Sequence, residues 1–336
     1  DYSVTPRPNY LADGRKLPDC YSNPPTLRDE LQQQLGQFPL FQFWGPGADI
    51  RSTRWIADAS VLIDKKHNPT LTLIYLPHLD YCLQKFGQNF SLIKKDLGEV
   101  DHEVEKLVKY YQSRNSKIIL LSEYGITNVD RPVHLNRVLR NAGLLKVRIE
   151  RGLELLDAGA SDAFAVADHQ VAHVYVNDQS KMESVRDLLK ATAGIEWVFD
   201  REQQKEHNIR HARAGDFVAV ADAHSWFTYY FWLHDSKAPD YARCVDIHKK
   251  PGYDPVEMFM SSKWRAAYKL LRKKLALRYV MDVIPLDASL IKGSHGRVDA
   301  DPQHHPVLIT TESAGKTSVT ATQVYDVIWK HLIESK

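Results

Sequence analysis

Residues 75–87, YLPHLDYCLQKFG, place a histidine and an aspartate directly after the apolar run LTLIYL (71–76). A run of this length is typical of a buried strand, and such strand ends often carry ligand-binding groups. Asp80 is a candidate metal ligand, although an Asp here could equally cap the following helix. His78 would point to the opposite face of a continuing strand, but a turn removes that alternation. At helical spacing from Asp80 stands Gln84, whose neutral amide oxygen is a weak zinc ligand.

A second strand end carries an acid and a phenol. SEYG (122–125) follows the apolar run KIILLS (117–122), so Glu123 and Tyr124 stand before a glycine that permits a tight turn. Glu123 is a candidate ligand, and a glutamate at a loop edge is the structural alternative. Ligands of open α/β sheets bind where loops leave the carboxyl ends of the strands, so both strand ends could contribute to one site.

GSHGR (293–297) sets a histidine between small residues. His295 can therefore approach a metal or an anion closely, and Arg297 could hold a phosphate. For this motif taken alone, a functional and a structural explanation are equally common.

Two other segments, ADHQVAH (167–173) and VDIHKKPGYDP (245–255), each place an aspartate near a histidine. A metal-binding histidine usually donates its other N–H to an acid. His169, Asp246 and His248 are therefore candidates for orienting a ligand or contacting a substrate. A structural pair is the commoner explanation of each segment.

No nucleophile is evident. The sequence has no GxSxG elbow, no P-loop and no GxGxxG after a strand. Cys82 lies near His78, but a cysteine in a core or loop is the commoner case. The three cysteines are isolated and odd in number, which indicates reduced thiols and a cytoplasmic protein.

Composition limits the possible partners. The 336 residues suit one large domain or two smaller ones. A formal net charge of +2 gives no indication of a nucleic acid polymer or an anionic membrane as partner. No apolar run approaches the roughly 20 residues of a membrane helix.

Apolar runs and amphipathic helices alternate along much of the chain. The runs at 71–76, 117–122 and 172–178 are predicted strands, and helices are predicted at 90–114 and 133–145. This alternation favours a mostly parallel sheet that helices cover on both faces.

Two later segments have their own character. The aromatic run WFTYYFW (226–232) could stack on a ligand, but core packing is the commoner explanation. The strongly basic segment near 263–278 is predicted to be a helix. This helix could expose a solvated face, form a partner surface or lie over the sheet.

In their order along the chain, six segments resemble the type I phosphodiesterase/nucleotide pyrophosphatase branch of the alkaline phosphatase superfamily. They are FWGPGADI, YLPHLDYCLQKFG, SEYGI, VHLNRVLRNAGLL, GDFVAVADAHSWF and GSHGR, and the resemblance spans residues 38–333. It implies one doubly wound α/β domain over residues 1–336, incomplete at its N-terminus, with an inserted region at about 234–292.

The resemblance also implies a divalent-metal site, with two metals that are usually zinc. Asp80 and His295 match the family's metal residues directly, and Glu123 replaces an aspartate. Gln84 and Tyr124 each stand where the family has a histidine. An amide oxygen suits harder cations such as Mn, Mg or Ca better than zinc, and a tyrosine could ligate only as phenolate or hydrogen-bond to substrate.

The expected residues form two sets. The metal set comprises Asp80, Glu123, His295, Gln84 and His78, and the set for substrate contacts or ligand orientation comprises Tyr124, His169, Asp246, His248 and Arg297.

Family members attack phosphorus with a Thr or Ser that follows the first strand, and no matching segment precedes FWGPGADI. The expectation is therefore a fragment whose nucleophile lies upstream or on a second chain. On either account, we expect no nucleophilic catalysis from these 336 residues alone.

The expected function is metal-dependent hydrolysis of small phosphate esters, phosphodiesters, nucleotide pyrophosphates or phosphonates. The alternative is a non-catalytic binding or scaffold protein that keeps the fold. A transferase or isomerase on the same scaffold is a third possibility, because a fold does not fix a function.

Overall fold

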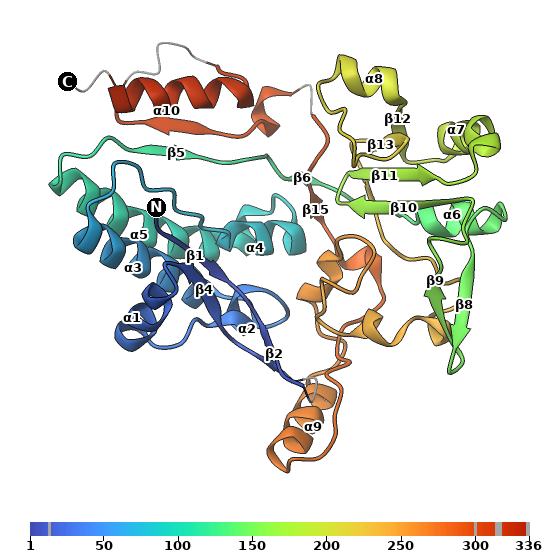
Figure 1. Cartoon of the computed structure of the whole chain (residues 1–336), viewed down its shortest axis with the longest axis horizontal. Helices are drawn as coiled ribbons and strands as arrows, with labels where there is room; N and C mark the ends of the chain where they lie inside the picture. Colours follow the sequence, from blue (N-terminus) through green and yellow to red (C-terminus); the bar gives the residue numbers. More distant parts are fainter. Residues whose placement is uncertain (13–14, 299–300, 313–317, 334–336) are drawn as a thin grey trace. The chain divides into compact units, whose positions relative to one another are not determined.

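The computed structural model describes residues 1–12, 15–298, 301–312 and 318–333 (Figure 1). The chain divides into two compact units. Unit 1 comprises residues 1–82, 89–125 and 305–336, and unit 2 comprises residues 83–88 and 126–304. Each unit mixes helices with short strands, so the α/β class expected from the sequence is confirmed.

Unit 1 is mainly helical, and its short strands form two-stranded pairs. Its helices are α1 (Thr26–Leu35), α2 (Leu40–Phe43), α3 (Ile50–His67), α4 (His78–Phe86), α5 (Phe90–Ser113) and α10 (Val324–Ile333). The residues of α4 from 83 onward belong to unit 2. Its strands are β1 (Ser3–Pro6), β2 (Asn9–Tyr10), β3 (Lys16–Leu17), β4 (Cys20–Asn23), β5 (Ile119–Leu121) and β16 (Leu308–Thr310).

Two buried acids fasten α3 to α5. Asp64 on α3 accepts a hydrogen bond from the Tyr110 hydroxyl at 2.7 Å, and Arg114 Nε lies 2.8 Å from the same carboxylate. Glu103 on α5 pairs with Arg54 Nε at 2.8 Å, and burial leaves its side chain almost no exposed surface. A buried carboxylate needs such partners, so the two ion pairs fix how α5 lies against α3.

Unit 2 is built around a four-stranded antiparallel sheet in the order β10-β11-β13-β12. Its strands are β6 (Thr127–Asn128), β7 (Arg131–Val133), β8 (Val147–Glu150), β9 (Leu153–Leu156), β10 (Ala163–Asp168), β11 (Val171–Val176), β12 (Ile195–Phe199), β13 (Phe217–Ala221), β14 (Ser225–Phe227) and β15 (Gly293–Ser294). Its helices are α6 (Leu135–Asn141), α7 (Met182–Ala191), α8 (Arg201–Glu206) and α9 (Lys263–Lys274).

The aromatic run 226–232 lies in the core of unit 2. All of its residues are buried, and its rings pack against one another, as Tyr230 and Trp232 do at 4.6 Å between centroids. The aromatic residues of the run belong to one hydrophobic cluster with the alanines of β10, β11 and β13 and with Val174 and Val176 of β11. Core packing, the commoner explanation of this run, is therefore confirmed.

The expected mostly parallel sheet differs from what the described residues form. Among the paired named strands, only β7 and β14 run parallel. β5 was expected to join a parallel sheet with the 71–76 run, but it pairs antiparallel with β16. A short apolar run indicates burial or pairing without specifying a partner, and here the partner comes from near the end of the chain.

Residues 71–76 form no strand in the described structure. Their exposure alternates as a strand's does, and the side chain of Leu73 is 79% exposed. No hydrogen bond between backbone groups of 71–76 and another segment is present in the described part of the chain. The predicted buried strand is wrong, because in the described residues no neighbouring strand pairs with this segment.

Three other predicted elements are confirmed. The helix expected at 90–114 is α5, the helix expected at 133–145 is the shorter α6, and the strand expected at 172–178 is β11. The basic helix is α9, of which only Ala266 is buried, so α9 does not cover a sheet with one face. In the ranges that the structure describes, no helix is both long and apolar enough to cross a membrane.

Replacement of Phe231 by alanine tests the aromatic core. The Phe231 side chain is fully buried, so Phe231→Ala removes apolar contacts and leaves a cavity. We expect the free energy of unfolding to fall by about 3–5 kcal/mol in urea denaturation. Phe90→Ala is the matched control, because Phe90 is 71% exposed and its loss is expected to cost much less. Equal losses in the two variants would contradict the assignment of Phe231 to the core.

Candidate functional site

Asp80 lies among phenols in unit 1. It stands in the first turn of α4, where the helix dipole favours a negative charge. Its backbone N–H donates to the carbonyl of Pro77, so Asp80 is inside the helix and is not its cap. The Tyr124 hydroxyl donates to Asp80 Oδ1 at 3.2 Å. Glu123 is exposed and precedes Tyr124 in sequence, and its charge acts together with that of Asp80 on the pKa of Tyr75 and of Tyr124.

The phenols of this group stay protonated at neutral pH. Burial, followed by the charge of Asp80, raises the pKa of Tyr124 well above its usual value. The same two causes raise the pKa of Tyr81, and burial with Asp80 and Glu123 raises the pKa of Tyr75. Tyr124 is therefore a neutral hydrogen-bond donor that orients Asp80. The expectation that it ligates as phenolate or contacts substrate directly gains no support from this geometry.

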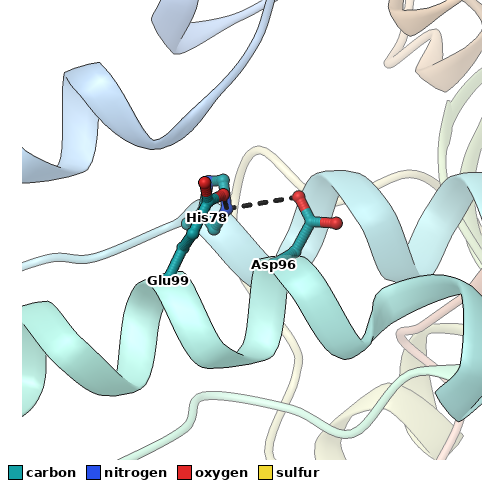
Figure 2. A group of neighbouring side chains, drawn as sticks. All are labelled: His78, Asp96 and Glu99. Atoms are coloured by element: carbon teal, nitrogen blue, oxygen red, sulfur yellow. Dashed lines mark ion pairs between the residues drawn. The ribbon is translucent and has the colours of Figure 1, made fainter.

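His78 faces two other acids in unit 1 (Figure 2). Its Nε2 lies 3.2 Å from Asp96 Oδ1 and 3.6 Å from Glu99 Oε2. Asp96 and Glu99 project from neighbouring turns of α5, while His78 begins α4. Sequence reasoning missed both acids, because only their three-residue spacing on one helix face was visible and nothing in the sequence connected them to His78.

His169 and His295 lie together in unit 2. Their ring centroids are 3.7 Å apart, and His169 Nδ1 bonds to Asp168 Oδ1 at 2.6 Å. His169 occupies the turn between β10 and β11 with a positive φ of 56°. Burial, and then the neighbouring His169, lower the pKa of His295 to about 3, so its imidazole is neutral at neutral pH. A neutral imidazole is the form that binds metals.

Gln84 and Arg297, also in unit 2, are engaged by the protein itself. The Gln84 side chain is fully buried, and its backbone carbonyl accepts a hydrogen bond from the Lys292 N–H at 2.9 Å. The Arg297 guanidinium makes two hydrogen bonds to Glu196, at 2.9 and 3.2 Å, and lies over the Trp197 ring. These contacts hold the guanidinium in place, and its predicted role toward a phosphate stays a prediction.

The segment around Asp246 and His248 holds a different charged group from the expected pair. His248 is exposed, and the Asp246 carboxylate lies 3.4 Å from Lys249 Nζ. Next to them Lys250 is fully buried, with its Nζ 2.7 Å from Asp254 Oδ2 and 2.6 Å from Glu257 Oε1.

The sequence alone does not predict this triad, because nothing in the sequence distinguishes a buried lysine from its exposed neighbour Lys249. Burial pulls the pKa of Lys250 down, but Asp254 and Glu257 outweigh it and leave that pKa raised. Lys250 is therefore a buried cation, and its contacts are explained by structure alone.

The five predicted metal residues belong to both units. Asp80, Glu123 and His78 lie in unit 1, whereas Gln84 and His295 lie in unit 2. Within unit 1, Asp80 and Glu123 share one neighbourhood, while His78 faces Asp96 and Glu99. The full five-residue metal site stays a prediction.

These observations describe a mixed α/β protein with an acidic, phenol-lined group that suits a divalent cation. The sequence model of the family "Type I phosphodiesterase / nucleotide pyrophosphatase" matches residues 2–254. The chain therefore belongs to this family, as its motif order indicated.

Solved structures that match the chain include murine ectonucleotide pyrophosphatase/phosphodiesterase 5, with 17% identity, a TM-score of 0.44, and coverage of 76% of this chain and 50% of that one. Phosphonoacetate hydrolase from Sinorhizobium meliloti 1021, in complex with phosphonoacetate, has 14% identity, a TM-score of 0.39, and coverage of 58% and 46%. The chain thus spans about half the length of these proteins. A search of curated proteins finds no match.

Replacement of Lys250 by methionine tests the buried triad. Lys250→Met keeps the length of the side chain but leaves two buried carboxylates without their cation. We expect a loss of roughly 3–5 kcal/mol in the free energy of unfolding, measured by urea denaturation. Lys249→Met is the control, because Lys249 is largely exposed and its loss is expected to have little effect. A stability of Lys250→Met equal to that of the control would show that the triad is not a buried ion group.

Proposed function

We propose that this chain is part of a metal-dependent hydrolase of small phosphate esters, phosphodiesters, nucleotide pyrophosphates or phosphonates. Membership of the family supports the reaction class. The observation that carries the proposal to residues is the hydrogen bond from Tyr124 to Asp80, which brings the segment of Glu123 beside α4. For the whole protein, the proposal includes the doubly wound single domain that the family resemblance implies.

Asp80 and Glu123 are the residues of unit 1 that would hold the metal. Both supply carboxylate oxygens, and the neutral Tyr124 phenol fixes the direction of one of them. The donor set therefore fits a divalent cation, with zinc first by family resemblance and Mn, Mg or Ca as alternatives that oxygen ligands suit. A metal in this class of enzyme activates the nucleophile and stabilises charge on the phosphoryl oxygens. The contributions of Gln84 and His295 remain part of the proposal.

The residues around Asp80 have a defined task in this proposal. Tyr75 and Tyr81 make its surroundings less polar, which strengthens the attraction between the carboxylate and a cation. The Tyr124 hydroxyl restrains the Asp80 carboxyl by donating to its Oδ1.

Removal of the two carboxylates tests the proposal. After equilibration with ZnCl₂ or MnCl₂, we expect Asp80→Asn and Glu123→Gln to lower the metal content of the chain, measured by elemental analysis. In the protein that includes any flanking segments, we expect the same variants to abolish hydrolysis of bis(4-nitrophenyl) phosphate. Asp101→Asn, an exposed acid on α5, is the control and is expected to change neither quantity.

Two results would reject the proposal. If Asp80→Asn and Glu123→Gln bind as much metal as the parent, these residues are not ligands. If the whole protein binds metal at Asp80 but hydrolyses no phosphodiester or phosphonate, the non-catalytic binding protein becomes the better description.

Loss of the Tyr124 hydroxyl tests the orienting hydrogen bond. Tyr124→Phe keeps the buried ring and removes only the donor to Asp80. Groups that orient a metal ligand typically contribute about 10–100-fold to metal affinity, so we expect a weakening in this range by isothermal titration. Tyr111→Phe, whose partly buried ring lies on α5, is the matched control and is expected to leave metal affinity unchanged. Unchanged affinity in Tyr124→Phe would show that the bond does not position Asp80.

A further inference from the structure

A histidine and two carboxylates converge between the start of α4 and the middle of α5 (Figure 2). One ligand atom from each of His78, Asp96 and Glu99 lies within 4.8 Å of the other two. The ion pairs of Asp64 and Glu103 hold α5 against α3 and so fix the helix that presents both acids. The arrangement is therefore part of the packed interior of unit 1.

The burial of His78 is compensated by ion-pair contacts but by no hydrogen bond in the described residues. Its side chain is only 2% exposed, and neither ring nitrogen makes a hydrogen bond of acceptable geometry in the described residues. Buried polar atoms are rarely left in this state, because the lost hydration costs free energy. Something that the protein residues do not supply should therefore satisfy Nε2, which points toward Asp96 and Glu99.

The spacing of the three groups matches a coordinated metal. A tetrahedral zinc ion with bonds of about 2.0–2.2 Å holds its ligand atoms roughly 3.3–3.6 Å apart. Nε2 of His78 lies 3.2 Å from one carboxylate oxygen and 3.6 Å from the other. The imidazole and carboxylate donors are also those that zinc, manganese and cobalt bind.

Solvent can reach the site from one side. The side chains of Asp96 and Glu99 are 29% and 30% exposed, whereas His78 is buried. An ion can therefore enter past the carboxylates, and water can complete its coordination. Lys95 lies 3.7 Å from Glu99 Oε1 but is itself 82% exposed, so this lysine can turn away into solvent.

We propose that His78, Asp96 and Glu99 bind one divalent transition-metal ion, zinc first, which joins the start of α4 to α5. The ion would neutralise the two carboxylates and give the buried imidazole a coordination bond where it makes no hydrogen bond. This site uses neither Asp80 nor Glu123 and has a structural role. It takes His78, which the sequence analysis placed in the hydrolase metal set, for a different ion. Family resemblance contributes nothing to it.

The competing explanation is a protonated His78 in two ion pairs. Burial lowers the pKa of His78, against the opposing charges of Asp96, Glu99 and the more distant Asp49, which caps α3 and bonds to Arg51. The experiment below separates the two explanations without relying on pH.

The test measures zinc and cobalt binding by the full chain. The double variant Asp96→Asn/Glu99→Gln keeps the shape of both side chains and removes both charges. With ZnCl₂, we expect the parent to hold one more equivalent of tightly bound metal than this variant. We also expect CoCl₂ to give the parent a visible absorption band typical of tetrahedral cobalt, which the variant lacks, and zinc to raise the melting temperature of the parent more.

Two control variants define the site. Glu105→Gln removes an exposed acid of α5 that lies 4.0 Å from His102, a similar acid–histidine pair on the surface. It should bind zinc as the parent does. Asp80→Asn/Glu123→Gln should keep the cobalt band, which distinguishes this site from the proposed hydrolase site.

The proposal is overturned if the parent and Asp96→Asn/Glu99→Gln hold the same number of zinc equivalents with the same affinity, or if the parent binds no zinc. Loss of binding in Glu105→Gln would identify surface binding instead. His78→Gln provides a second check that leaves both acids in place, and we expect its zinc affinity to fall by more than about 100-fold. Unchanged affinity in a folded His78→Gln would exclude the imidazole as a ligand.

Discussion

The need to neutralise buried charge governs how this chain packs. A carboxylate or ammonium taken out of water is costly unless an opposite charge or several hydrogen bonds replace the lost hydration. Glu103 and Asp64 meet that need with basic and phenolic groups, and α3 and α5 lie together as a result. Lys250 meets it in unit 2 with Asp254 and Glu257. In each case the ionic contact fixes the position of a helix or loop that apolar packing alone would leave less well defined.

The same requirement separates the candidate sites from the structural ion pairs. Around Asp80, Tyr124 supplies a hydrogen bond but no positive charge. Around His78, two carboxylates supply negative charge but no hydrogen bond of good geometry. Our two proposals assign a cation to each of these groups, for different reasons. In the Lys250 triad, by contrast, a side chain supplies the positive charge. Its Nζ lies within ordinary ion-pair distance of Asp254 and Glu257.

The sequence predicted much of this because periodicity and composition report on local structure. The amphipathic pattern of α5 and the buried aromatic run 226–232 were visible as sequence, and the motif order identified the family. Pairing was not visible, because the partner of β5 comes from residues 308–310, nearly 190 positions away. For the same reason Asp96 and Glu99 escaped notice: charge and spacing on one helix do not show which buried histidine the helix meets.

The exposed segment 71–76 has a consequence for the behaviour of the chain in solution. LTLIYL has no charge and no proline, and its backbone groups make no strand pairs in the described structure. Five apolar residues and one threonine without a strand partner are a template onto which another copy can add as a strand. Self-association of the chain can therefore begin at this stretch, where the Leu73 side chain is 79% exposed.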